Sequence, residues 1–257
     1  MEKVLALASR DFKRIRLWKS YVLLLLIPPV AYLLFFSVAM SSSIQGITYG
    51  GKQLSYLAFV LPGLLAMQAF SQYPVQIAHS ANDKRWGIFR ALMTAGVRAF
   101  EYIWAQVINR MLVIFFQAMA ILLVGGVLSR SFPITIHGYV MIFITLLVSG
   151  TLWTLLGIMM GVRIDSEEKR DALWVIFNLP VMFSSSVFYD IQRAPTYVVV
   201  LSHLNPLTYT ADLMRAAFYG DPFVEIGKLV LLLAMAIVIY FACLHVVKNI
   251  ELVPGAK

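Results

Sequence analysis

Six long apolar runs, separated by short segments rich in Lys and Arg, constrain this chain more than any other feature. The runs lie at roughly 21–40, 54–77, 103–128, 138–162, 172–188 and 229–247. About 20 helical residues cross a hydrocarbon core about 30 Å thick, and the run at 172–188 is short and marginal. Because 60% of the 257 residues are hydrophobic, we predict an integral membrane protein. Open sheets would leave amides unpaired in lipid, so the expected fold is all-α with six transmembrane helices.

The distribution of basic residues predicts the orientation. With the N-terminus in the cytoplasm, the inner segments hold fifteen Lys and Arg residues and the outer segments hold five. Such a bias is typical of the cytoplasmic side of a membrane protein. We therefore expect a multi-pass protein of the cell (inner) membrane with both termini in the cytoplasm. This topology also accounts for the net charge of +8, so a nucleic-acid partner is not expected.

We expect one transmembrane domain over residues 1–257. It comprises an N-terminal interfacial helix (1–20), five spans (21–188), a re-entrant outer segment (189–228), a sixth span (229–247) and a cytoplasmic tail (248–257). The interfacial helix has an apolar face and a largely basic opposite face, which favours the inner leaflet. Its predicted contact residues are Arg10, Phe12, Lys13 and Arg14. A topology anchor and a docking surface for a cytoplasmic partner are both compatible with this pattern.

The sequence offers no expected metal or nucleotide site. Cys243 is the single cysteine, and the four histidines are far apart, which does not match the ligand spacing of a metal centre. Residues 46–52 fit the spacing of a phosphate-binding loop, but Gln53 follows Lys52 where that loop needs Ser or Thr for magnesium. We expect this segment to be a flexible outer turn. Energy for any work must then come from another subunit or an ion gradient.

A polar stripe in the third run is a candidate substrate path. Gln106, Arg110 and Gln117 fall within about 100° on a helix. They either line the path, or Arg110 snorkels to the inner headgroups and the stripe has no such role. The spans hold no other clear ionisable candidate, and the absence of buried carboxylates argues against a proton-coupled carrier.

The inner loop after the second run predicts a short amphipathic helix from about Asp83 to Ala95. Asn82 is expected to cap it and Gly96 to end it. Such a helix is too weak to span, and it is either an intracellular coupling helix or another interfacial anchor. The predicted coupling residues are Asp83, Lys84, Arg85, Trp86, Gly87, Phe89, Arg90 and Leu92. The charged segment 163–171 offers a second contact.

The outer segment from Phe183 to Glu225 is too apolar for a free loop and favours a re-entrant hairpin. Asn205 and Pro206 form an N-cap and first-turn pair. The helix that they begin carries Leu207, Met214 and Phe218 on one face. It also contains Tyr209, and its Asp212 and Arg215 are spaced three residues apart so that they can pair. The hairpin is predicted to be a lid over the exit path. Phe183 and Phe188 are predicted to form an apolar plug beneath it. An outer-leaflet anchor without a gating role is the alternative.

Small residues in the fourth run predict a close helix contact. Gly157 and Gly161 form a small-xxx-small step, with Gly150 one heptad earlier. Packing within one subunit is the favoured use, and an interface between subunits is the alternative.

These motifs, in this order, resemble the membrane subunit of a type-2 ABC transporter, the ABC-2 permease family. The resemblance covers nearly the whole chain and is carried by LPG at 61–63, DKR at 83–85 with Gly87, FSSS at 183–186 with Phe188 and Tyr189, Pro195, and NPLTY at 205–209 with Asp212 and Arg215. One departure is Ala95–Gly96–Val97, where relatives commonly have a proline before the valine. The N-terminal entry is more similar to drug-efflux and nodulation-type permeases than to polysaccharide exporters.

The resemblance implies half of an exporter. Two permeases pair, as two copies or as paralogues, and each engages a cytoplasmic ABC ATPase subunit that binds ATP and magnesium. This chain would bind no cofactor and would not itself be an enzyme. Its apolar interior suits a hydrophobic or amphipathic substrate, such as a drug-like molecule, lipid or glycolipid. The alternatives from the residues alone are an ion-coupled secondary transporter and an integral membrane enzyme.

Overall fold

A computed structural model describes residues 2–17, 27–28, 30–37, 47–49, 51–129, 134–164, 166–191, 194–220 and 225–251. The elements in chain order are α1 (Glu2–Leu17), the π-helix η1 (Tyr32–Ser37), β1 (Ile47–Tyr49), β2 (Lys52–Leu54), α4 (Tyr56–Arg85), α5 (Ile88–Thr94), α6 (Ala99–Ser129), α7 (Ile136–Gly161), α8 (Glu167–Phe183), α9 (Thr196–Leu204), α10 (Pro206–Tyr219) and α11 (Ile226–Glu251). This nearly all-helical content confirms the predicted class.

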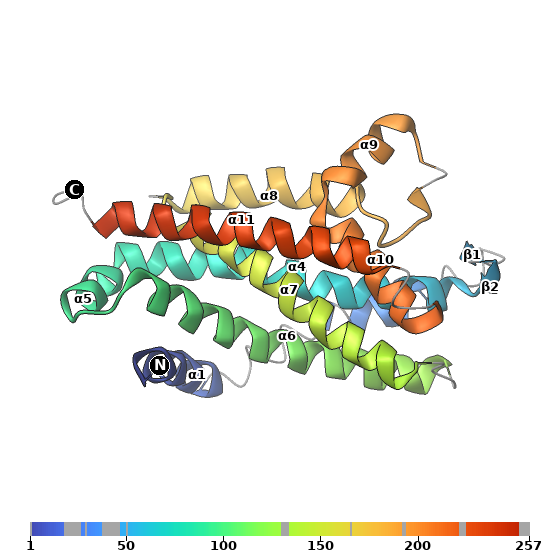
Figure 1. The fold of residues 1–257 in the computed structure, drawn as a ribbon, viewed down its shortest axis with the longest axis horizontal. Coiled ribbons are helices and arrows are strands. Elements are labelled where there is room, and N and C mark those ends of the chain that lie inside the picture. Colours follow the sequence, from blue (N-terminus) through green and yellow to red (C-terminus); the bar gives the residue numbers. More distant parts are fainter. Residues whose placement is uncertain are drawn as a thin grey trace.

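The long helices α4, α6, α7, α8 and α11 run along the long axis of the molecule (Figure 1). One end, which we call the α5 end, carries α5 and the C-terminal end of α11. The other, which we call the hairpin end, carries β1, β2, α9 and α10. Helix α1 is seen nearly end-on beside α6, so it lies crosswise to the bundle, as a helix on a membrane surface would.

Three described helices are long and apolar enough to cross a membrane by length and composition: α6, α7 and α11, over Ala99–Val127, Ile136–Gly161 and Ile226–Asn249. They support an integral membrane protein. Half of the first predicted run, 21–40, lies outside the described residues. Helix α4 is long but rich in buried polar side chains, and α8 has 17 residues. The set of six spans therefore stays a prediction.

Helix α4 forms the centre of the bundle, in contact with α6, α7 and α10. Ser55 begins it, because the backbone N–H of Ala58 donates to the Ser55 hydroxyl oxygen at 3.2 Å. Against α7, a Cβ placed on Gly157 would lie 2.8 Å from the Tyr73 carbonyl, and one on Gly161 would lie 2.6 Å from the Ile77 carbonyl. These glycines therefore let the backbones of α4 and α7 approach closely within the subunit. This confirms the prediction that the Gly157–Gly161 step serves packing within one subunit.

The inner loop differs from its prediction at its start. Asn82 does not cap a helix, because α4 continues to Arg85 and the chain turns at Gly87, with φ of +70°, before α5. Only glycine adopts this backbone at little cost. The predicted end is right, since Gly96 follows α5 in the left-handed conformation with φ of +76°.

Two other boundaries also differ. The fifth run was expected over 172–188, but α8 begins at Glu167, where the Ser166 hydroxyl accepts from the N–H of Lys169 at 3.3 Å, and ends at Phe183. The outer turn predicted to be flexible contributes to an antiparallel hairpin, in which Tyr49 pairs with Lys52. A charged first turn of a helix and backbone pairing across a short turn are harder to recognise in a sequence than long apolar runs. The start of α8 and the β1–β2 hairpin were therefore not predicted.

Candidate functional site

At the α5 end, the predicted coupling helix α5 is fixed by its apolar side. Phe89 is buried, and its ring meets that of Tyr102 edge-on at 5.3 Å, while Leu92 packs against the core. Phe89, one of the predicted coupling residues, therefore lies on the side of α5 that faces α6, and its part in coupling stays a prediction. Trp86, which follows α4 just before the turn, is 64% exposed, and Arg90 is exposed on α5. Gly87 is exposed at the turn and Lys84 is half-buried.

Asp83 is also buried, although it was predicted as a coupling contact. Its side chain is 2% exposed. The Tyr102 hydroxyl donates to Asp83 Oδ2 at 3.1 Å, and His79 Nδ1 lies 3.5 Å from the same oxygen. A buried carboxylate needs such partners, because leaving it unpaired costs several kcal/mol, on the order of 3–5. Asp83 therefore joins α4 to α6 just beneath α5.

Two further contacts join other elements to the α5 end. Lys3 Nζ of α1 donates to the Gly96 carbonyl at 2.7 Å, at the C-terminal end of α5. Arg85 pairs with Glu167 of α8 at 2.7 Å, which brings the predicted second charged segment beside the first. Of the four predicted contacts on α1, Arg10 is exposed. The side chains of Phe12, Lys13 and Arg14 lie outside the described part of the structure.

The polar stripe of α6 faces α4. Arg110 is 5% exposed, and its Nε donates to Gln76 Oε1 at 2.7 Å. Gln76 also donates to Gln106 at 3.5 Å, and Gln72 donates to Gln117 at 3.1 Å. Arg110 therefore does not snorkel to the headgroups. The amide partners of the stripe on α4, Gln72 and Gln76, are four residues apart, and this spacing could have predicted a matching polar face.

At the hairpin end, Arg215 of α10 joins three segments. It is 1% exposed, and its guanidinium carbon lies 4.0 Å from the centroid of the Phe59 ring. Its nitrogens donate to the Phe59 carbonyl at 3.3 Å, the Val187 carbonyl at 2.9 Å, and the hydroxyl and carbonyl oxygens of Ser186. The predicted pair with Asp212 is confirmed at 3.5 Å. Arg215 thus holds α10 against α4 and the segment after α8.

The predicted N-cap of α10 is confirmed. Asn205 Oδ1 accepts from the N–H of Leu207 at 2.9 Å, Pro206 occupies the first turn, and Asn205 Nδ2 donates to the Val181 carbonyl at 2.6 Å. Tyr209 donates from its hydroxyl to the His203 carbonyl. The face predicted to be covered is covered, since Leu207, Met214 and Phe218 are all buried. Helix α10 packs against α4 and α7 instead of lying free in solvent.

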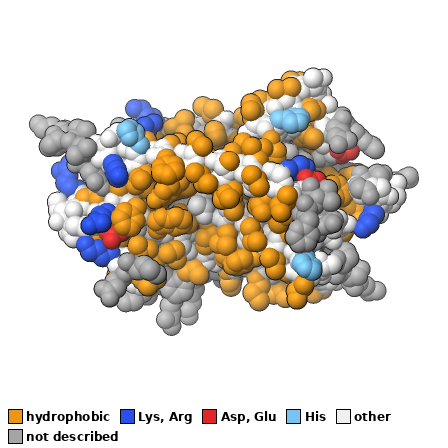
Figure 2. Space-filling model, in the orientation of Figure 1, with side chains coloured by type: hydrophobic (Ala, Val, Ile, Leu, Met, Phe, Trp, Pro, Cys, Tyr) orange, Lys and Arg blue, Asp and Glu red, His pale blue; other side chains and the backbone are white. Residues whose placement is uncertain are grey.

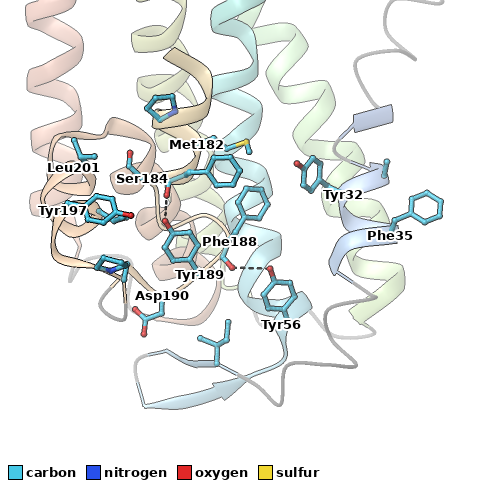
Figure 3. A pocket seen from close by; sticks show the side chains of 17 residues that line it. Tyr32, Phe35, Tyr56, Met182, Ser184, Phe188, Tyr189, Asp190, Tyr197 and Leu201 are labelled. Atoms are coloured by element: carbon cyan, nitrogen blue, oxygen red, sulfur yellow. Dashed lines mark hydrogen bonds between the residues drawn. The ribbon is translucent and has the colours of Figure 1, made fainter. Parts of the chain in front are cut away.

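Close to α10, a cavity of about 1310 Å³ lies between η1, the end of α8 and α9. Figure 3 shows Phe188 between Tyr32 on one side and Tyr189 on the other. The Phe188 ring lies 5.6 Å from that of Tyr32, and its carbonyl accepts from the Tyr56 hydroxyl at 3.3 Å. The other predicted plug residue, Phe183, is exposed and also lines the cavity.

Sequence reasoning missed most of this aromatic wall. Tyr32, Tyr56, Tyr189 and Tyr197 come from segments far apart in the chain, and no spacing rule links them. Burial, followed by repulsion from Tyr197, raises the pKa of Tyr189 above its ordinary value, so this phenol stays protonated at neutral pH. Among the described residues, no group of three His, Cys, Asp or Glu side chains is placed to hold a metal ion.

An apolar belt covers the long helices, and on the face in Figure 2 most Lys and Arg side chains lie at the α5 end. The apolar helices and the crosswise α1 are those of an integral membrane protein. The profile of the ABC-2 type transporter family matches residues 2–219, and the chain belongs to this family.

Several relatives carry transport names. A putative transport permease, ycf38, from Cyanophora paradoxa is 23% identical over 219 residues, which cover 84% of this chain and 73% of that protein. The inner membrane transport permease YadH of Escherichia coli K12 is 23% identical over 202 residues, 76% of this chain and 75% of that protein. A probable multidrug ABC transporter permease, YbhR, from the same organism is 20% identical over 177 residues, 67% of this chain and 47% of that protein.

Proposed function

We propose that this chain is the permease subunit of an ATP-driven exporter, with its α5 end in the cytoplasm. The observation that carries the proposal is the construction of that end. Phe89 and Lys3 fix α5 to α6 and α1, while Trp86 and Arg90 stay exposed beside Arg85. A helix held rigidly on one side and exposed on the other transmits the movement of a bound partner to the bundle. The partner is a cytoplasmic ABC ATPase that binds ATP and magnesium.

The substrate that we propose is hydrophobic or amphipathic and leaves from the cytoplasm or the inner leaflet. The aromatic cavity at the hairpin end supports this choice, because apolar walls with few polar groups favour such molecules. The similarity to a relative named as a multidrug permease also supports it. Phe183 and Phe188, at the cavity, are the gate residues of this proposal, and α10 is its lid.

The functional unit that we propose contains two permeases. No side chain of α8 is buried in the single chain, and Ile176, Leu179 and Phe183 expose large apolar surfaces along it. An exposed apolar helix face is covered either by lipid or by a partner. A second copy or a paralogue, with α8 at the contact, places the two outer cavities on either side of a shared path.

The test removes two exposed side chains, one just before α5 and one on it, without disturbing the buried side of α5. In vesicles that contain the permease and its ATPase, Trp86→Ala together with Arg90→Ala should reduce ATP-dependent transport at least about tenfold, because loss of central anchor residues commonly weakens an interface by more than 1 kcal/mol each. The permease should still insert and should melt at the wild-type temperature.

Lys248→Ala is the matched control, because Lys248 is exposed on α11 at the same end. This variant should transport at the wild-type rate. Transport by the double variant at the wild-type rate would contradict the assignment of α5. Transport that continues without ATP and stops when an ion gradient is dissipated would indicate a secondary transporter instead.

A further inference from the structure

The outer cavity has an uneven distribution of charge. Seven aromatic side chains line it: Tyr32, Phe35, Tyr56, Phe183, Phe188, Tyr189 and Tyr197. Asp190 is the single charged side chain among the described lining residues, and no described Lys or Arg lines the cavity. Figure 3 places Asp190 at the edge of the group, beside Tyr189 and away from Phe188. The cavity thus has an apolar aromatic body and one acidic point at its rim.

These features select the sign of a ligand's charge. The face of an aromatic ring is electronegative and attracts a cation by about 0.5–2 kcal/mol, depending on how far the cation is desolvated. A carboxylate at the rim adds to this attraction and repels an anion. An uncharged ligand would gain from the apolar walls alone. An amphiphile with a positive centre uses both parts of the cavity at once.

We propose that this cavity is a binding site for amphipathic organic cations. The apolar body of the ligand lies among Tyr32, Phe188 and Tyr197, and its positive centre lies at the rim near Asp190. Transport of the bound cation depends on the proposed function, but its binding does not. The binding itself is a property of the cavity and can be measured without the ATPase.

The size and walls of the cavity fit such a ligand. Its volume of about 1310 Å³ exceeds the roughly 300–1,000 Å³ of common small-molecule sites, so a bulky polycyclic or branched apolar body can enter. Its walls come from η1, from the end of α8 and from α9, which belong to separate parts of the bundle. One bound molecule therefore contacts η1, the end of α8 and α9 together.

Tetraphenylphosphonium and tetraphenylborate test the proposal, because they have nearly the same shape and opposite charge. Binding of each ion to the purified permease in detergent should favour the phosphonium ion by about tenfold. Asp190→Asn should remove most of this preference by weakening phosphonium binding, while Tyr197→Ala should weaken the binding of both ions. Glu168→Gln is the matched control, because it removes one negative charge from an exposed position at the α5 end and should change neither affinity.

Several results would overturn the proposal. Equal affinities of the wild-type protein for the two ions would mean that the cavity is merely apolar. Unchanged phosphonium binding in both Asp190→Asn and Tyr197→Ala would mean that the ion binds elsewhere. Phosphonium binding by monomers but not by cross-linked dimers would mean that a second copy of the chain fills the cavity. The wild-type comparison stands even where a variant does not fold.

Two further experiments are needed. One distinguishes a lipid ligand from a free amphiphile, and the other distinguishes failure of this inference from failure of the proposed function. In nanodiscs, displacement of the probe by phosphatidylethanolamine but not by phosphatidylglycerol supports an ammonium headgroup of a lipid, and displacement by neither supports a free amphiphile. ATP-dependent transport without phosphonium binding would contradict this inference alone. Phosphonium binding without any ATP-dependent transport would contradict the proposed function alone.

Discussion

At the scale of residues, Arg215 shows how a buried charge becomes a structural joint. It satisfies carbonyl oxygens of Phe59, Ser186 and Val187 and pairs with Asp212. Arg215→Ala would leave these acceptors without their donor in a region that water does not reach. We expect a loss of about 3 kcal/mol in stability, the lower end for a broken buried pair, because Lys228 still contacts Asp212 at 2.8 Å.

The measurement is the melting temperature of the detergent-solubilised protein, followed by size-exclusion chromatography after heating. Arg215→Lys should fall between the wild type and Arg215→Ala, since an ammonium group keeps the charge but not the planar fork. Arg90→Ala, at an exposed arginine, is the control and should not lower the melting temperature. A wild-type melting temperature for Arg215→Ala would contradict the role of this side chain.

At the scale of elements, the contact between α4 and α7 depends on the absence of side chains. Gly157→Ala would place a Cβ 2.7 Å from Gln76 Cβ and 2.8 Å from the Tyr73 carbonyl. The helices must then move apart, and overpacking of this kind costs about 1–3 kcal/mol. Gly227→Ala is the control, because a Cβ there meets no atom within 4 Å. Thermal melting that shows equal effects of the two substitutions would argue against a tight α4–α7 contact.

At the scale of the whole molecule, we expect two permeases to pair through the exposed face of α8. Ile176 is 68% exposed on this face. In a background with Cys243→Ala, the substitution Ile176→Cys should give a disulfide-linked dimer in native membranes under mild oxidation. Val238→Cys on α11 is the control, because Val238 is equally exposed at 68% on another helix. Equal cross-linking at both positions, or at Val238 alone, would place the contact elsewhere.

Patterns along the chain predict the class of protein and many of its local features. Apolar runs predict membrane helices because each helix satisfies its own backbone and needs only an apolar surface. The cap at Asn205 and the end of the coupling helix at Gly96 were predicted because capping depends on a few neighbouring residues. The Asp212–Arg215 pair followed from spacing on one helix.

The tertiary structure decided which side of each helix is covered and which distant groups meet. Asp83 and Phe89 look like surface residues in a basic loop, yet both contact Tyr102. Arg110 is held by an amide of α4, a partner that no rule within α6 can name. The aromatic cavity draws its walls from segments at both ends of the chain. Local hydropathy and capping act over a few residues, whereas these contacts exist only after the helices pack together.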